Sequence, residues 1–173
     1  MRPSDETLQR LRAAFSYDSA TGEFRHLTPG NPNWRGKIAG AIDSKGHRRL
    51  AFWKRRRCTS FAAHNVAWFL FYGEWPELVD HINRDPADNR IANLRLCTAS
   101  QNTCNRTHRK RQSGIHGVTQ SNGRFMARIF FNRQRHYLGM FETEVQAADA
   151  YNRAARSLHG EFASLNHLST EAL

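Results

Sequence analysis

The segment with the densest chemistry reads VDHINRDPADNRIANLRLCTASQN and occupies residues 79–102. Its aspartate, histidine and asparagine side chains are more numerous than a fold requires: Asp80, His81, Asp85, Asp88, Asn89, Asn93 and Asn102. Aspartate and asparagine often build turns by hydrogen bonding from side chain to backbone, and we assign this role to Asp85, Asp88 and Asn89. The other four side chains are candidates for chemistry.

The local pattern predicts two short strands and a helix. LVDHI at residues 78–82 is expected to be a strand that leads into a polar loop, and LRLCT at residues 94–98 is expected to be a second strand. A helix that carries Asn102 follows. Because neighbours in a regular strand point to opposite faces, Asp80 and His81 can share a site only if the first strand ends or twists there, as we expect.

These four side chains suit the hydrolysis of a phosphodiester bond. The reaction needs a base that deprotonates water and a hard cation that stabilises the charge developing on the phosphate. His81 is the natural base, because an unperturbed imidazole titrates near neutral pH. Asp80 and Asn102 offer the oxygen ligands that Mg²⁺ or Mn²⁺ prefers, with phosphate and water completing the shell. Asn93 could orient the imidazole.

The motifs VDHIN, DNR and NLR and the downstream QN resemble the HNH homing endonucleases of phages and introns, which are built on the ββα-metal motif. The resemblance continues back through AHNVAW and YDSATGEF, so it covers residues 1–105. It implies that Asp80 and Asn102 are metal ligands, that His81 is the general base and that Asn93 positions the base.

The composition indicates a polyanionic partner. Lys and Arg total 26 against 15 Asp and Glu in 173 residues, which gives a formal charge of +11. Nucleic acid is the most plausible partner, and an RNA-binding protein would share this balance. The chain has no apolar run of membrane-spanning length and no signal-peptide core at its start, so we expect the cytoplasm of a bacterial or phage-infected host cell. Cys58, Cys97 and Cys104 form no C-x-x-C pair, and we expect them to be reduced and mostly buried.

The residues before the polar segment predict an N-terminal helix, a small antiparallel sheet and a second helix. The sheet has a basic tip at Lys54, Arg55, Arg56 and Arg57, which we expect to contact phosphate, although it can also be a solvated hairpin turn. AHNVAWFLFYG at residues 63–73 predicts a buried helix that ends at a glycine C-cap. We interpret His64, at its start, as a cap or a core hydrogen-bonding residue, and Trp68, Phe69 and Phe71 as core residues.

The C-terminal pattern predicts a three-stranded antiparallel sheet covered by one helix. Turns are expected at Asn122–Gly123 and at residues 132–134, and Thr143 and Gln146 form a capping box at the start of an alanine-rich helix. One face of the sheet stays open and can present side chains to base edges. The candidates are Thr119, Gln120, Arg124, Arg128, Arg133 and Arg135.

The motifs HGV, GRFMARI and YLGMF and the helix EVQAADAYNRAARSLHGEFASLN resemble the plant ethylene-response-factor (APETALA-type) DNA-binding domain across residues 113–166. The resemblance implies that Arg124, Arg128 and Arg135 contact DNA. Plant domains usually carry Glu at the position of Arg128, so their base preference does not transfer. The expected core residues are Phe125, Tyr137, Leu138 and Phe141.

We therefore expect an α+β protein with two modules joined by a basic linker. The linker contains Arg109, Lys110 and Arg111, which we expect to contact phosphate rather than to form only a solvated hinge. The expected divisions are a nuclease module with an N-terminal DNA-binding sheet at residues 1–105, whose ββα-metal core starts at residue 78, a linker at 106–113 and a DNA-binding domain at 114–168.

We interpret the chain as a metal-dependent endonuclease of the HNH homing type that acts on double-stranded DNA. One predicted site per chain favours a monomer that nicks one strand, although a transient dimer could cut both strands. A DNA-binding regulator with an inactive nuclease site is the first alternative, and the presence of all four proposed catalytic side chains argues against it. An RNA-binding or ribosome-associated protein is the second, and it would have no use for the arrangement of Asp80, His81 and Asn102.

Overall fold

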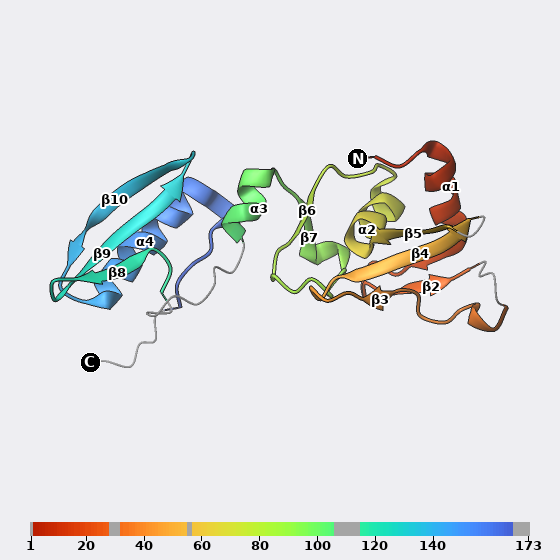
Figure 1. The fold of residues 1–173 in the computed structure, drawn as a ribbon, viewed down its shortest axis with the longest axis horizontal. Helices are drawn as coiled ribbons and strands as arrows, with labels where there is room; N and C mark the ends of the chain where they lie inside the picture. The colour runs from red at the N-terminus through yellow and green to blue at the C-terminus, as the bar shows by residue number, and fades with distance from the viewer. Residues whose placement is uncertain (1, 28–31, 55–56, 106–114, 168–173) are drawn as a thin grey trace. The chain divides into compact units, whose positions relative to one another are not determined.

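The computed structural model shows two compact units, Met1–Ala99 and Ser100–Leu173. The predicted division into residues 1–105, 106–113 and 114–168 stays a prediction. The residues that the structure describes are 2–27, 32–54, 57–105 and 115–167 (Figure 1). Both units mix helices with antiparallel sheets, so the α+β class is confirmed.

The first unit consists of short elements joined by tight turns. In chain order they are α1 (Asp5–Ala14), β1 (Phe15–Tyr17), β2 (Phe24–His26), η1 (Pro32–Trp34), β3 (Ala41–Ile42), β4 (Arg48–Lys54), β5 (Arg57–Ala62), α2 (Ala63–Tyr72), β6 (Val79–His81), η2 (Ile91–Asn93) and β7 (Leu94–Leu96). The helix α3 (Ala99–Asn105) follows. Three sheets result, with strand orders β1-β2, β3-β4-β5 and β6-β7.

The two helices of this unit follow their sequence patterns. The Ser4 side chain accepts a hydrogen bond from the backbone N–H of Thr7 and caps α1, which buries Leu8 and Leu11. The helix α2 ends at Gly73 in the left-handed conformation, as predicted. Its buried face joins α1 and the sheets in one core, whose most buried large side chains include Phe24, Leu11, Leu50 and Val66.

Two of the three aromatic residues predicted for the core of α2 lie there, and one does not. Phe69 is buried, and Trp68 is partly buried against the same core. Phe71 is 50% exposed, so its assignment to the core was wrong. It lies on the outer side of the helix, where its ring contacts Tyr72.

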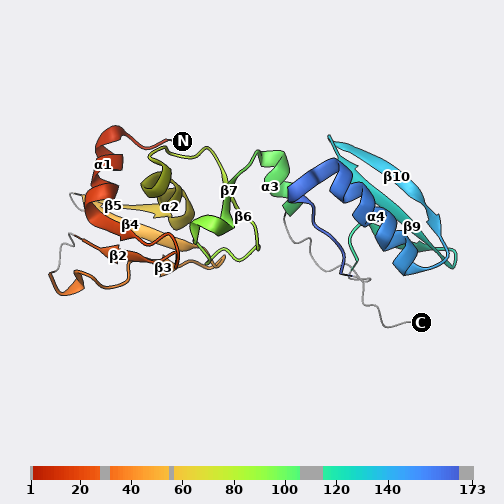
Figure 2. The same cartoon turned by 180° about the vertical axis from the view of Figure 1, so that it is seen from behind.

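The second unit contains a three-stranded antiparallel sheet packed on one helix, as predicted. Its elements are β8 (Val118–Ser121), β9 (Arg124–Phe131), β10 (Gln134–Phe141), α4 (Glu144–His159) and η3 (Gly160–Phe162), with strand order β10-β9-β8. Both hairpins turn through residues with positive φ, Asn122–Gly123 in one and Asn132 and Arg133 in the other. The helix α4 lies against a single face of the sheet, as the opposite views of Figures 1 and 2 show.

Small residues allow α4 to approach the sheet closely. The predicted capping box is present: Thr143 accepts from the backbone N–H of Gln146, and the Gln146 side chain accepts from that of Thr143. Ala147 and Ala148 pack against Val118 and Ala127 in a fully buried cluster. Among the described residues, no helix packs on the other face of the sheet.

A pair of buried asparagines ties the end of this unit to its beginning. Asn152 on α4 exchanges hydrogen bonds with the backbone of Asn166, at 2.7 and 3.0 Å. The Asn166 side chain in turn accepts from the His116 backbone N–H at 2.6 Å and donates to its carbonyl at 3.1 Å. These hydrogen bonds attach Asn166 to α4 and to the backbone of His116, just before β8.

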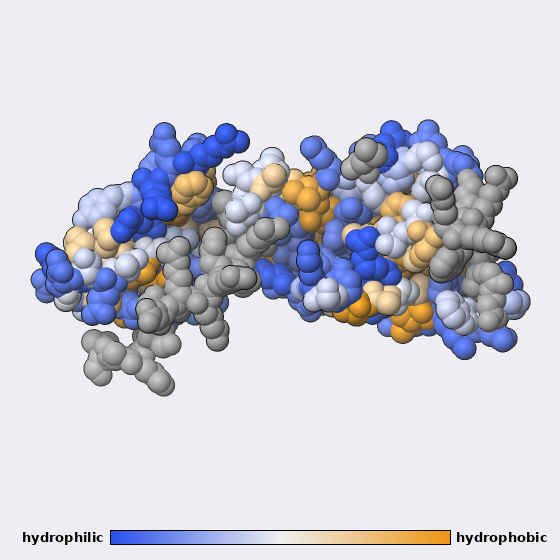
Figure 3. Space-filling model, viewed as in Figure 1, coloured by the Kyte–Doolittle hydropathy of each residue, from blue (hydrophilic) through white to orange (hydrophobic). Residues whose placement is uncertain are grey.

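The face shown in Figure 3 is mostly hydrophilic, with apolar residues in small separate patches. Among the described residues, no helix is long and apolar enough to cross a bilayer. Cys58 is exposed and Cys97 is partly buried, both as free thiols, so the expectation of mostly buried cysteines was wrong for Cys58.

Candidate functional site

The candidate site is built on the hairpin of β6 and β7. The strands pair antiparallel, with Asp80 opposite Arg95 and His81 opposite Leu94. The strand β6 ends at His81, where the backbone N–H of Arg84 donates to the His81 carbonyl at 3.0 Å and Arg84 adopts a φ of 65°. The predicted strand end is confirmed. Asp80 and His81 are both buried, at 6% and 7% exposure.

Asp80 is held by a buried ion pair across the hairpin. The guanidinium of Arg95 donates from Nε and from Nη2 to the same carboxylate oxygen, Oδ2, at 3.0 and 2.9 Å. Both side chains are almost fully excluded from solvent, at 7% and 11% exposure. The pair compensates a charge that would otherwise be costly to bury, and it fixes the direction of the carboxylate.

Asn93 braces the polar loop that follows His81. Its Oδ1 accepts from the backbone N–H of Asn83, and its Nδ2 donates to the Asn83 side chain and to the Asp88 carbonyl, all at 2.9 Å. Asn93 was predicted from the sequence to orient the His81 imidazole. These three bonds instead fix the backbone leaving His81, so a positioning role for Asn93 acts through the loop and stays a prediction.

The remaining polar residues of the loop build turns, as expected. Asp85 Oδ1 accepts from the Ala87 backbone N–H, and Asn89 Nδ2 donates to the Ala87 carbonyl, both at 2.9 Å. Asp88 accepts from the backbone and guanidinium of Arg90, which lowers the pKa of Asp88 to about 2. The turn-building assignment is confirmed for these residues.

The hairpin of β1 and β2 packs against this loop, a contact that was not predicted from the sequence. The Tyr17 hydroxyl donates to the Asn89 carbonyl at 2.7 Å, and burial raises the pKa of Tyr17, so it remains a neutral donor. Gly22 adopts a φ of 75°, and a Cβ there would lie 2.6 Å from the Arg90 backbone nitrogen. Only glycine permits this approach.

Three histidines from distant parts of the chain meet at the hairpin. The His64 and His81 rings lie 5.1 Å apart between centroids in an edge-to-face arrangement, and His47 lies 5.7 Å from His64 and 6.1 Å from His81. His47 was not among the residues predicted from the sequence. The prediction that His64 is a cap or a core hydrogen-bonding residue was wrong: α2 has no side-chain cap, and the buried Nδ1 of His64 has no hydrogen-bond partner among the described residues.

The surroundings favour neutral rings at the two buried histidines. Burial lowers the pKa of His64 to about 3, with His81 and His47 acting in the same direction. Burial also lowers the pKa of His81, while the Asn89 side chain opposes this shift by hydrogen bonding. A neutral imidazole can accept a proton, so the His81 environment suits the general base that the sequence predicted.

In the second unit, the sheet face opposite α4 alternates arginines with aromatic rings. Arg128 lies directly across from Tyr137 in the pairing of β9 with β10, and Arg135 lies across from Phe130. Phe130 and Tyr137 are 60% and 61% exposed. Two of the arginines predicted to contact DNA thus share one open face.

Tyr137 was expected in the core, and this expectation was wrong. Its pairing with Arg128 places it on the open face, whereas the next residue, Leu138, packs under α4. The register shifts between Tyr137 and Gly139, so a simple alternation does not continue through the strand. Phe125 and Phe141 pack against the buried cluster, as predicted.

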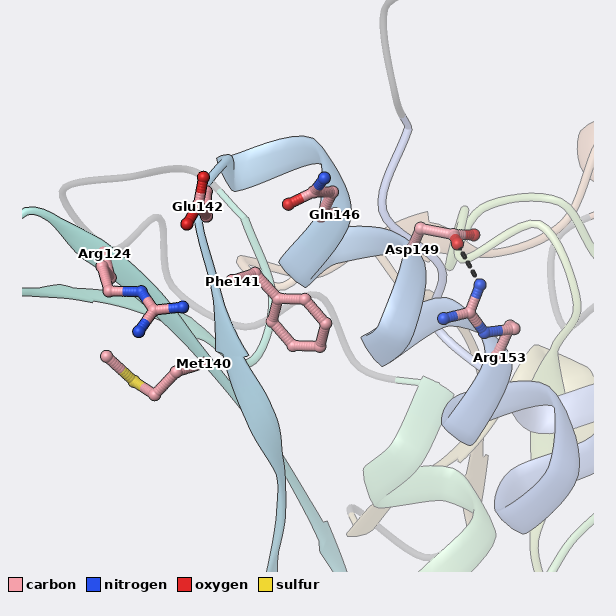
Figure 4. A pocket seen from close by; sticks show the side chains of 7 residues that line it. All are labelled: Arg124, Met140, Phe141, Glu142, Gln146, Asp149 and Arg153. Atoms are coloured by element: carbon pink, nitrogen blue, oxygen red, sulfur yellow. Dashed lines mark hydrogen bonds and ion pairs between the residues drawn. The ribbon is translucent and has the colours of Figure 1, made fainter.

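The third predicted arginine, Arg124, lines a pocket of about 400 Å³ at the end of the sheet (Figure 4). Glu142 faces the same pocket, as does an ion pair between Asp149 and Arg153 on α4. The two carboxylates of the pocket are matched in number by the guanidinium groups of Arg124 and Arg153. Arg124 therefore lies beside carboxylates that a DNA phosphate would have to approach.

Several predicted phosphate contacts fall partly or wholly outside the described residues. Lys54 ends β4 and Arg57 begins β5, opposite each other in the sheet, and their side chains are not described. The predicted residues that lie outside the described ranges are Arg55, Arg56, Arg109, Lys110 and Arg111.

Comparison with known proteins bears on the same hairpin. Residues 61–104 match the HNH endonuclease family model. This HNH segment contains α2, β6, the polar loop, β7 and most of α3, and with them all four predicted catalytic and metal-binding side chains. His47, β1 and β2 lie before it.

An uncharacterized HNH endonuclease of Acanthamoeba polyphaga mimivirus is 36% identical over 90 residues, which make up 52% of this chain and 47% of that protein. The chain thus spans about half the length of this curated relative. A solved structure of the HNH homing endonuclease I-HmuI, a protein that binds and cleaves DNA, is 24% identical with a TM-score of 0.41 and covers 51% of this chain and 49% of its own.

The donor set of the HNH segment fits a hard divalent cation bound by few protein ligands. Among the described residues, no three His, Cys, Asp or Glu side chains converge as a metal site. Asp80 supplies the carboxylate, and Mg²⁺ is commonly held by one or two protein oxygens plus water and phosphate. Asn102 is partly buried on α3, in the second unit, and its partnership with Asp80 stays a prediction.

Proposed function

We propose that this protein is a metal-dependent DNA endonuclease of the homing type that hydrolyses phosphodiester bonds and nicks one strand. The observation that carries the proposal is His81, a buried imidazole at the end of β6 whose pKa is lowered, next to the ion-paired Asp80 in the HNH segment. A base of this kind beside an oxygen ligand is what hydrolysis of a phosphodiester requires.

The roles follow from the contacts. His81 takes the proton of the attacking water, and burial, which lowers its pKa, favours the unprotonated ring beforehand. Asp80 and Asn102 would hold Mg²⁺ or Mn²⁺, which supplies charge stabilisation on the phosphate and the leaving oxygen. Arg95 fixes the Asp80 carboxylate, and Asn93 holds the loop that leaves His81.

Sequence preference then comes from other surfaces, because base and metal act on backbone atoms. We assign it to the second unit, whose resemblance to the plant ethylene-response-factor domain implies DNA contacts by Arg124, Arg128 and Arg135. Arg128 is half-buried and Arg135 is exposed, and their position on the sheet face that α4 does not cover supports this assignment. The partner is double-stranded DNA, bound by one copy of the chain in the cytoplasm.

One observation favours a second candidate, a DNA-binding regulator with an inactive nuclease site. Arg95 donates two hydrogen bonds to Asp80, so a cation would have to share or displace a guanidinium. If a cation can neither share the Asp80 carboxylate with Arg95 nor displace Arg95, no metal binds and the nuclease site is inactive. Cleavage assays decide between the two candidates.

The test uses supercoiled plasmid incubated with the protein in Mg²⁺, in Mn²⁺ and in EDTA, with products separated on a gel. We expect metal-dependent nicking by the unmodified protein and none by His81→Ala, which should still bind duplex DNA. His167→Ala, at an exposed histidine of the second unit, is the matched control and should cut normally. Tight duplex binding with no cleavage, on a plasmid library that contains random target sites, would support the regulator instead.

A further inference from the structure

His47 is presented to the candidate site by a rigid loop. Asp43 and His47 close this loop: the Asp43 backbone N–H donates to the His47 carbonyl at 2.8 Å, and Asp43 Oδ1 accepts from the backbone N–H groups of Lys45 and His47 at 2.8 and 3.0 Å. A side chain bonded to its own turn in this way restricts the backbone strongly.

The same loop packs directly against the polar loop of the HNH segment. Gly46 adopts a φ of 84°, and a Cβ there would lie 2.9 Å from Cγ of Pro86. Both the backbone conformation and the close approach therefore require glycine. The contact fixes the distance between the two loops and places the His47 ring 6.1 Å from that of His81.

His47 differs from its two neighbours in exposure. His81 is 7% exposed and Nδ1 of His64 is buried, whereas 35% of the His47 side chain is accessible. Nδ1 of His47 lies 3.8 Å from Asp43 Oδ1, which directs Nε2, on the other side of the ring, away from the carboxylate. The His47 ring is thus more accessible to a bound substrate than the His81 ring.

We propose that His47 is a substrate-contacting residue of the nuclease site, donating from Nε2–H to a non-bridging oxygen of the phosphate that His81-activated water attacks. The proposal rests on the proposed nuclease function. Rings 6.1 Å apart can both reach one phosphate group, because a hydrogen bond of about 3 Å extends from each ring. A donor aimed at oxygens that gain charge in the transition state accelerates the reaction rather than only binding substrate.

His64 packs against both of these rings. Its centroid lies 5.1 Å from that of His81 and 5.7 Å from that of His47. Burial lowers the pKa of His64 to about 3, so this ring adds no positive charge beside the other two. Of the three rings, we assign the contact with the phosphate oxygen to His47.

The test compares His47→Ala and His47→Phe with the unmodified protein in single-turnover cleavage of plasmid DNA in Mg²⁺, with DNA affinity measured separately. Phenylalanine keeps a ring against His64 and His81 but has no donor. We expect both variants to cut about a hundredfold more slowly with DNA affinity changed by no more than a few-fold. Lys45→Ala, which removes a cation from the same loop, is the control for general charge and should keep the cleavage rate.

The outcomes separate this inference from the proposed function. If the unmodified protein cuts and His81→Ala does not, but His47→Phe cuts at the normal rate, His47 only packs and the inference is overturned. If no form cuts, the nuclease proposal fails, and ring-nitrogen NMR of His47 in EDTA with a short duplex oligonucleotide tests the contact alone. The His47 nitrogens should then shift on binding, and unchanged nitrogens in a protein whose backbone signals respond would overturn it.

Discussion

Replacing Arg95 by methionine should destabilise the first unit severely, because the Asp80 carboxylate would stay buried without its guanidinium. Arg95 donates two hydrogen bonds to Oδ2, at 3.0 and 2.9 Å, and the two side chains are 11% and 7% exposed. Removing one partner of a buried ion pair costs about 3–5 kcal/mol. Methionine keeps most of the side-chain length, so the loss is electrostatic rather than steric.

This magnitude is large against the stability of the unit. A domain of this size has about 5–15 kcal/mol in total, and each 1 kcal/mol shifts the melting temperature by about 4–8 °C. We therefore expect the melting temperature to fall by about 12 °C or more. Urea unfolding followed by tryptophan fluorescence gives the free energy, and circular dichroism gives the melting temperature.

Arg90→Met is the matched control, since Arg90 pairs with Asp88 in the same loop but is 54% exposed. Solvent around the exposed guanidinium screens this pair, although the Asp88 side chain is only 12% exposed, so this variant should lose about 1 kcal/mol. Adding Asp80→Asn to Arg95→Met should recover part of the lost stability, because no buried charge remains. If Arg95→Met unfolded within about 1 kcal/mol of the unmodified protein, the carboxylate would be solvated in solution and the buried-pair argument would fail.

Three further perturbations probe other parts of the structure. The unfolded chain binds a proton at His64 near pH 6.5 whereas the folded chain does so only near pH 3, so stability should fall as the pH drops through this window. His64→Phe should flatten that dependence in urea titrations, and an unchanged slope would mean that water reaches the ring. Gly22→Ala should cost at least about 2 kcal/mol from strain and backbone overlap, against about 1 for Gly36→Ala, which has a similar φ of 76° but no described atom within 4 Å of the added carbon. Asn166→Ala should destabilise the second unit by about 2–3 kcal/mol, measured by thermal melting, since two side-chain hydrogen bonds to His116 are lost; a loss under half that value would show that water replaces them.

Features set by neighbouring residues were predictable from the sequence. The glycine C-cap of α2, the capping box at Thr143 and the positive-φ turn at Asn122 each depend on a few residues in succession. The end of β6 at His81 was inferred from a local conflict between strand geometry and shared chemistry, and it is present. The turn-building role of the loop aspartates follows from the same short-range chemistry.

Features set by contacts between distant residues were not predictable in this way. His47 and His81 are separated in sequence by the strands β4 and β5 and the helix α2, and only folding brings their rings to 6.1 Å. Tyr137 looked like a core residue because it is aromatic and lies in a strand, but pairing with Arg128 turns it to the open face. Asn89 and Asn93 lie in one loop, and no local sequence pattern indicates that the Asn89 side chain, rather than that of Asn93, interacts with the His81 imidazole.

The HNH segment is therefore not a complete site by itself. It carries His81 and its hairpin, but the loop that it contains is held by Tyr17 and by the close approach of Gly22, which both precede residue 61. His47 also lies before the matched residues, on a loop that packs on Pro86. Because the hairpin β6–β7 has only three residues in each strand, these contacts add to the Asp80–Arg95 pair and the Asn93 hydrogen bonds that hold it from within. Residues before position 61 thus help to position the side chains that we propose as catalytic.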